Sequence, residues 1–96
     1  MQVAKVIGNI WATRKEEALE GFKLLLVKPV DVLNEGKDFA PIVAADIIGA
    51  GVGETVIIVS GSSARNATRN TSIPVDATVV GIVDDLEVDG KKKAVQ

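Results

Sequence analysis

The sequence predicts an all-β domain that folds as one small barrel of five or six short strands. Apolar residues, many of them β-branched, fall in short segments separated by turns that contain glycine, asparagine or aspartate. Glycines also occur inside two of these segments, at Gly8 and Gly81, where a sheet bends sharply. The chain has 96 residues and shows no linker, repeat or low-complexity stretch, so residues 1–96 are expected to form a single domain.

Residues 3–12 ("VAKVIGNIWA") form the first expected strand, because their side chains alternate between two different faces. One face is small and apolar, and it consists of Ala4, Val6, Gly8 and Ile10. The other face mixes polar residues with Ile7 and Trp11. We expect Ile7 and Trp11 to share this face, and Trp11 to serve in packing or as an interface anchor rather than as a ligand platform.

Residues 22–32, 41–48 and 55–59 form the next three strands, and each carries apolar residues on both faces. Strands that read this way are covered by protein on both sides. A small barrel has only one inside, so the outer faces need a cover from elsewhere. We expect a neighbouring subunit to provide it.

The connections between these strands favour antiparallel pairing. Residues 14–21 are too short for a convincing helix and are predicted to be a loop, and residues 34–38 ("NEGKD") are a polar turn. Near the end of the chain, Asp89-Gly90 predicts a two-residue hairpin turn between "LEV" and "KKKAV".

One short helical turn is predicted at the start of residues 62–70, with Ser62 or Ser63 as its N-cap. Pro74 then precedes the strand at 76–84. Five or six short strands with bends at interior glycines are typical of a small OB-like barrel.

The composition favours self-association. Hydrophobic residues make up 47% of the chain and its mean hydropathy is positive. A domain of this size has much surface for its volume, so the hydrophobic core of a single chain cannot bury all of these apolar residues. Excess apolar surface on a small protein usually marks an interaction site.

The composition also excludes several kinds of site. The chain has no cysteine and no histidine, which removes disulfides, the common zinc sites and histidine-based catalysis. The acidic residues near the end lack the spacing and glycine of an EF-hand loop; they are Asp84, Asp85, Glu87 and Asp89. We therefore expect a solvated strand end there, no metal, no cofactor and no enzymatic activity.

Charge and hydropathy limit the partners and the location. The net charge is −2 and only three residues are aromatic, which argues against nucleic-acid binding. The first residues lack the apolar region of a signal peptide, and no apolar run is long enough to span a bilayer. We expect a cytoplasmic protein without a membrane partner.

The glycine-rich stretch "GAGVGE" (49–54) raises the question of phosphate binding. A dinucleotide fingerprint places its third glycine at the sixth position and continues into a helix. Here Glu54 holds that position and a β segment follows. The Gly-Lys-Ser/Thr of a P-loop is absent as well. We predict a tight turn in which Gly49, Gly51 and Gly53 supply backbone angles open only to glycine.

The stretch "GSSAR" (61–65) resembles half of a nucleophile elbow. Arg65 stands where the second glycine belongs, however, and no histidine is present to act as a base. The favoured interpretation is a serine N-cap, with Arg65 in a salt bridge or at an interface. A Ser–Lys dyad stays open as an alternative.

Five separated motifs closely resemble the pentameric vertex proteins of bacterial microcompartment shells, the EutN/CcmL family. The resemblance covers about residues 1 to 88, and its motifs occur in the order of the family. They are "AKVIGNIWATRK" (4–15), "LEGFKLLLV" (19–27), "AADIIGAGVGETV" (44–56), "VSGSSAR" (59–65) and "PVDATVVGIVD" (74–84). Each motif alone is weak, but the combination is highly specific.

The resemblance implies an OB-like barrel that assembles as a cyclic homopentamer. Family members occupy the vertices of a polyhedral shell whose facets are tiled by hexameric shell proteins and which encloses metabolic enzymes. The resemblance also implies candidate residues for the central pore or the subunit interface, namely Gly49, Gly51, Gly53, Glu54, Gly61, Ser62, Ser63 and Arg65. Thr13, Arg14 and Lys15 match the loop after the first strand and are candidates for hexamer contacts.

The alternative function is a small-ligand-binding OB-like module that also oligomerises. Such a module needs a concave surface with aromatic residues, and we see none in the sequence. The C-terminal tail, residues 89–96, follows no strong family pattern, so its role is open.

Overall fold

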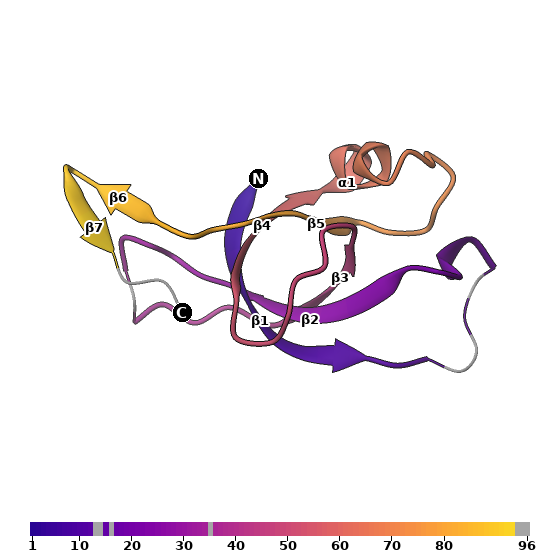
Figure 1. The fold of residues 1–96 in the computed structure, drawn as a ribbon, viewed down its shortest axis with the longest axis horizontal. Helices are drawn as coiled ribbons and strands as arrows, with labels where there is room; N and C mark the ends of the chain where they lie inside the picture. Colours follow the sequence, from indigo (N-terminus) through magenta and orange to yellow (C-terminus); the bar gives the residue numbers. More distant parts are fainter. Residues whose placement is uncertain (13–14, 16, 35, 94–96) are drawn as a thin grey trace.

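The computed structural model describes residues 1–12, 15, 17–34 and 36–93, and it contains a closed five-stranded β-barrel (Figure 1). The all-β prediction with one short helix is confirmed, and two further strands form a separate sheet. The elements are β1 (Gln2–Ile10), the 3-10 turn η1 (Glu17–Leu19), β2 (Lys23–Pro29), β3 (Ile42–Asp46), β4 (Thr55–Ser60), α1 (Gly61–Ala67), β5 (Ala77–Ile82), β6 (Leu86–Val88) and β7 (Lys91–Lys93). The turn η1 lies within the predicted loop at 14–21.

Around the barrel the strands follow the order β1-β2-β3-β5-β4, and β4 closes the circle against β1. Every described pair is antiparallel except β3 with β5, which run parallel through only Ala45↔Thr78 and Asp46↔Val79. The antiparallel expectation is therefore wrong at this seam. The reason is that β4 separates the two strands along the chain: β4 runs antiparallel to β5, so after β4 and α1 the chain returns in the direction of β3.

The core consists of the inward-facing residues of the five strands. In β2, Leu25 and Val27 are fully buried while the residues between and beside them keep partial exposure. In β4, Val56 and Ile58 occupy the equivalent inward positions. The outer faces stay apolar and only partly covered within one chain; Val43 of β3, for example, is 46% exposed. Full burial of such a side chain is worth about 1.5–3 kcal/mol, so these faces favour association.

A β-bulge in β1 changes which residues share a face. The pairing register with β2 shifts between Val6 and Gly8, which makes Ile7 the extra residue. After the bulge, Asn9 lies opposite a fully buried residue of β2. The prediction that Ile7 and Trp11 share one face is therefore wrong, because alternation from the bulge onward groups Trp11 with Asn9.

The helix α1 begins at Gly61, directly where β4 ends. Pairing of β4 with β5 continues through Ser60, so Ser60 is still extended when it takes the N-cap position. Its side chain makes no capping hydrogen bond. The prediction of Ser62 or Ser63 as N-cap is wrong, since both lie inside the helix. Gly61, with a φ of +61°, makes the turn from strand into helix.

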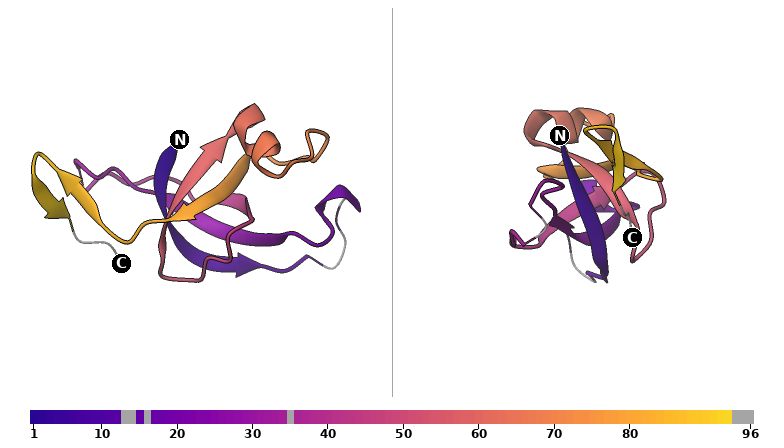
Figure 2. Two further views of the ribbon diagram at one scale, coloured as in Figure 1. Left: turned by 45° about the horizontal axis from the view of Figure 1, so that its top comes forward. Right: turned by 90° about the vertical axis from the view of Figure 1, so that its left-hand side faces the viewer.

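The predicted Asp89-Gly90 turn is confirmed. Val88 pairs with Lys91, which leaves the two turn residues with φ values of 52° and 76°, as in a type I′ hairpin. The resulting β6–β7 hairpin stands away from the barrel at one end of a molecule whose extents are 44 × 23 × 21 Å (Figure 2). Its two strands pair only with each other among the described strands.

Candidate functional site

Asp46 organises the glycine-rich loop that joins β3 to β4. The backbone N–H groups of Ile48, Gly49 and Ala50 all donate to its carboxylate, at distances of 2.9–3.2 Å. Asp46 itself is only 7% exposed, so these bonds replace the water that a carboxylate normally binds. Asp46 was not among the residues predicted from the sequence. The available signal was an aspartate two to four residues before a glycine turn, a position from which its side chain binds following amides.

Further hydrogen bonds fix the second half of the loop. The Gly51 N–H donates to Oε1 of Glu54 at 2.7 Å, and the Gly53 N–H donates to the Val6 carbonyl at 2.9 Å. The Nζ of Lys23 donates to the Ala50 carbonyl, also at 2.9 Å, and ties the loop to β2. A carboxylate therefore fills the place that a phosphate would need, which agrees with the predicted tight turn.

Two of the three loop glycines have the backbone conformation that the sequence analysis expects. Gly49 and Gly53 both have a φ of +95°. Gly51 does not, so the expectation is wrong for that residue. A Cβ added at Gly49 or Gly53 would meet nothing within 4 Å, which means that backbone strain alone requires glycine there.

We expect Gly53→Ala to lower the free energy of unfolding by about 1–2 kcal/mol, because a Cβ at positive φ is strained. Gly51→Ala is the matched control. Its Cβ would lie 3.5 Å from Oε1 of Glu54, an ordinary contact, and we expect a change within about 0.5 kcal/mol. Thermal unfolding of both variants measures the difference; equal melting temperatures would show that the loop does not depend on glycine geometry.

The "GSSAR" segment lies at the opposite end of β4 from the glycine loop. Ser62 and Ser63 are exposed on α1, and neither makes a hydrogen bond with a lysine in the part of the chain that the structure describes. Arg65 donates through Nη1 to the Val75 carbonyl at 3.2 Å. No salt bridge joins it to any residue that the structure describes. Its possible place at an interface stays a prediction.

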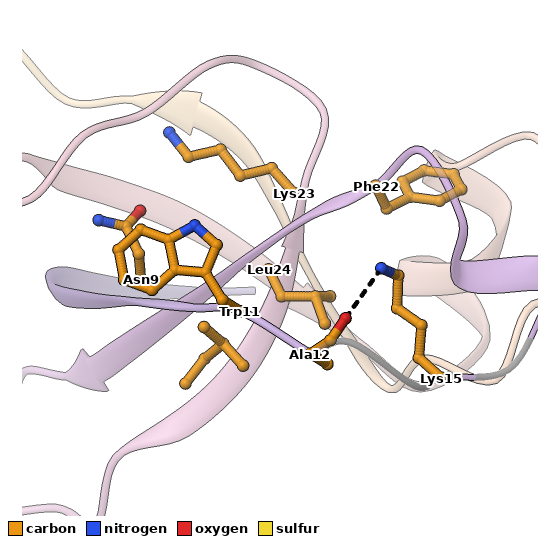
Figure 3. A pocket seen from close by; sticks show the side chains of 8 residues that line it. Asn9, Trp11, Ala12, Lys15, Phe22, Lys23 and Leu24 are labelled. Carbon is orange, nitrogen blue, oxygen red and sulfur yellow. Dashed lines mark hydrogen bonds between the residues drawn. The ribbon is translucent and has the colours of Figure 1, made fainter.

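Trp11 lies beside a cleft at the β1–β2 end of the molecule. The residues that line the cleft are Asn9, Ile10, Trp11, Ala12, Lys15, Phe22, Lys23 and Leu24. Figure 3 shows the indole of Trp11 beside Asn9, with Lys23 on the same side of the ribbon. The structure thus forms a concave surface that includes two aromatic residues, which the analysis of the sequence did not find. The sequence signal available was that Trp11 and Phe22 stand at the two ends of one connection between paired strands, which brings them to the same end of the barrel.

Of the remaining predicted contact residues, the structure describes Ile7, Trp11 and Lys15. Ile7 is 40% exposed and Trp11 is 86% exposed, so both have surface available for a partner. Lys15 is exposed, and its Nζ donates to the Ala12 carbonyl at 3.4 Å. Thr13 and Arg14 lie outside the described residues.

The glycine loop also presents three apolar side chains that the sequence analysis did not select. Ile47, Ile48 and Val52 are 41%, 46% and 57% exposed. Because Asp46 and the backbone bonds hold this loop, the three side chains are presented without a large further loss of conformational freedom. A fixed apolar loop of this kind suits an interface with another protein chain.

The described residues contain no constellation for catalysis or metal binding. No group of three or more acidic residues there is arranged to hold a metal ion. The described helices include none that is long and apolar enough to cross a membrane. What the geometry offers is a small closed barrel with partly exposed apolar surfaces, which suits a structural or assembly protein.

Comparison with known proteins specifies this class. Residues 1–84 match the sequence profile of the family described as "Ethanolamine utilisation protein EutN/carboxysome". The chain belongs to this EutN/CcmL family, and the resemblance seen in its motifs is confirmed. Relatives in the family are named as shell vertex proteins and not as enzymes.

Three relatives illustrate the similarity. The microcompartment shell vertex protein EutN of Salmonella typhimurium is 46% identical over 91 residues, which cover 95% of this chain and 91% of the relative. The structure of CcmL from Nostoc matches with a TM-score of 0.87 and 43% identity over all of both chains. The pentameric microcompartment shell protein GrpN of Rhodospirillum rubrum matches with a TM-score of 0.80 and 43% identity, covering 92% of this chain and 99% of GrpN.

Proposed function

We propose that this chain is a structural vertex protein that forms homopentamers and closes the polyhedral shell of a bacterial microcompartment in the cytoplasm. The observation that carries the proposal is membership of a family whose named members are shell vertex proteins of microcompartments and carboxysomes. The pentameric GrpN structure, which shares the fold and 43% of the sequence, supports the five-fold assembly. The partly exposed apolar faces of the barrel agree with burial between copies.

At the level of residues, the glycine loop and the start of α1 are the proposed linings of the subunit interface or central pore. Gly49 and Gly53 give the loop a shape that lets another backbone approach closely. The side chains of Ser62 and Ser63 are exposed and can contact a second copy. Trp11 and Ile7 are the proposed interface anchors, because large exposed apolar side chains contribute strongly when an interface buries them.

Hexameric facet proteins are the proposed second partner, and the loop after β1 is the proposed contact. Thr13, Arg14 and Lys15 place polar and cationic groups in one short stretch. A single rim contact of this kind is weak. Five copies in one ring engage neighbours simultaneously, so the avidity of the assembly greatly exceeds the affinity of one contact.

Native mass spectrometry of the purified protein tests the proposal, and we expect a mass of five chains. Co-production with hexameric shell proteins should then yield a complex of pentamers with hexamers. Arg14→Glu should reduce this complex without changing the number of chains per ring, whereas Lys37→Glu, on a different connection, should leave it unchanged. A stable monomer would refute the proposed function; a hexameric ring would reject the vertex position.

A further inference from the structure

A cleft with two lysines in its lining lies at the β1–β2 end of the molecule. These are Lys15 and Lys23; none of the described residues that line the cleft is acidic, and Trp11 at its side is 86% exposed. In the described part of the chain, both ammonium groups donate only to main-chain carbonyls, at 3.4 and 2.9 Å. The cleft therefore suits a partner that brings carboxylates together with apolar side chains.

An open strand edge adjoins this cleft. β1 pairs with β4 only as far as Lys5, whereas its pairing with β2 extends to Ile10. Among the described strands, residues 8–10 thus have a partner on one side only. An unpaired edge of this kind is a template for an added strand.

The β6–β7 hairpin has the complementary properties. Both of its outer edges lack a described strand partner, and an isolated two-stranded hairpin is only marginally stable in water. Alternation places Leu86 and Val88 on one face, and each is half-buried. Acidic residues accompany β6, at Asp84, Asp85 and Glu87. Of their described ion pairs only Asp85 with Lys92 is present, at 3.7 Å between exposed side chains.

These two features cannot meet within one chain. The hairpin stands at one end of the long axis and the β1–β2 connection at the other, in both Figure 1 and Figure 2. A cyclic ring joins two different patches of identical subunits at every interface. Features at opposite ends of a long subunit can meet in such a ring without any additional protein.

We infer that the β6 edge of one copy adds to the β1 edge at residues 8–10 of the next copy, with Glu87 of the hairpin against Lys23 on the side of the sheet where Trp11 lies. The occupant of the cleft is thus a second copy of this chain. This inference rests on the proposed ring assembly and assigns a role to a hairpin that lies beyond the residues matched by the family profile.

Cross-linking tests the contact directly, because the chain contains no cysteine. A chain that carries both Asn9→Cys and Glu87→Cys, treated with a short bismaleimide, should give a ladder up to five chains on a denaturing gel. Each single variant should give no ladder, because the contact joins two different sites. The matched control is Asn9→Cys with Lys37→Cys, whose second cysteine lies on the β2–β3 connection, and it should also give none.

Charge reversal gives a second measurement that does not depend on cross-linker reach. Lys23→Glu and Glu87→Lys should each weaken ring assembly by about tenfold, and the combined variant should recover most of that loss. Trp11 is the only tryptophan, so its fluorescence emission should shift to the blue on assembly. The shift should be smaller in each single charge-reversal variant and should largely return in the combined variant.

The outcomes separate this inference from the proposed function. Pentamers that give no ladder and tolerate both charge reversals would overturn the inference and leave the vertex role intact. A wild-type protein that forms no ring at all would remove the proposed function itself.

Discussion

Asp46→Ala is expected to lower the free energy of unfolding by about 2–4 kcal/mol. The carboxylate accepts bonds from three successive amides of the glycine loop, and the Ala50 amide among them is buried. Removing the acceptor leaves that donor without a partner, which costs about 1–3 kcal/mol, and adds the loss of the other bonds. Chemical denaturation with urea, followed by far-UV circular dichroism, measures the change.

The control for this prediction is Asp84→Ala. Asp84 is exposed, and we expect a change within about 0.5 kcal/mol. Asp46→Asn should fall between the two, because its amide oxygen still accepts while its amide nitrogen cannot. If Asp46→Ala were as stable as Asp84→Ala, the loop would not depend on this carboxylate.

Shells assembled without this protein are expected to be open, elongated or leaky, and to retain enclosed enzymes poorly. Hexagonal tiles alone make a flat sheet or a tube, and closure in two directions requires five-fold positions. A ring of five identical barrels fits such a position, because five copies of one contact close without a free edge. Electron microscopy of the shells and a cargo-leakage assay measure the effect.

Adding the wild-type protein back should restore closed polyhedra. A variant that native mass spectrometry shows to be monomeric should not, because its rim contacts act one at a time. Shells of normal shape and tightness, in cells that lack this protein and any paralogue, would contradict the vertex role.

Much of the barrel could be predicted from the sequence, because its strands are short and their alternation is clear. The bends predicted at Gly8 and Gly81 both coincide with register shifts in the sheet. The type I′ turn at Asp89-Gly90 follows from local backbone preference alone. These features depend on neighbouring residues, which a single sequence displays directly.

The wrong predictions concern strand faces and strand directions that depend on residues distant in sequence. The bulge at Ile7 reverses the faces of β1 from that residue onward; Gly8 marks the bend, but the change of register is set by the pairing with β2. The parallel pairing of β3 with β5 depends on the path of the crossover. Asp46 is a different case: it was not predicted although its hydrogen-bond partners lie only two to four residues further along the chain.

The family resemblance identified the class of protein where composition could only suggest self-association. It selected glycines as a group, and the structure distinguishes Gly51 from its neighbours by backbone angle. The cleft beside Trp11 could not be predicted because it forms between two strands that the connection at 11–22 holds together.

The parallel seam between β3 and β5 is expected to form after the β1–β2 and β2–β3 pairs. Only Ala45↔Thr78 and Asp46↔Val79 hold it, and these pairs are farther apart in sequence than any β1–β2 or β2–β3 pair, although the β1–β4 pairs are more distant still. Contacts so distant in sequence form late, because the entropic cost of closing a long loop must first be offset by other contacts. The hairpin of β1 with β2 and its extension to β3 involve near neighbours and form earlier. The residues that close the seam include Asp46, whose carboxylate also shapes the glycine loop. Completion of the barrel and completion of that exposed loop are thereby linked, so a half-folded subunit lacks a finished surface to offer to its neighbours.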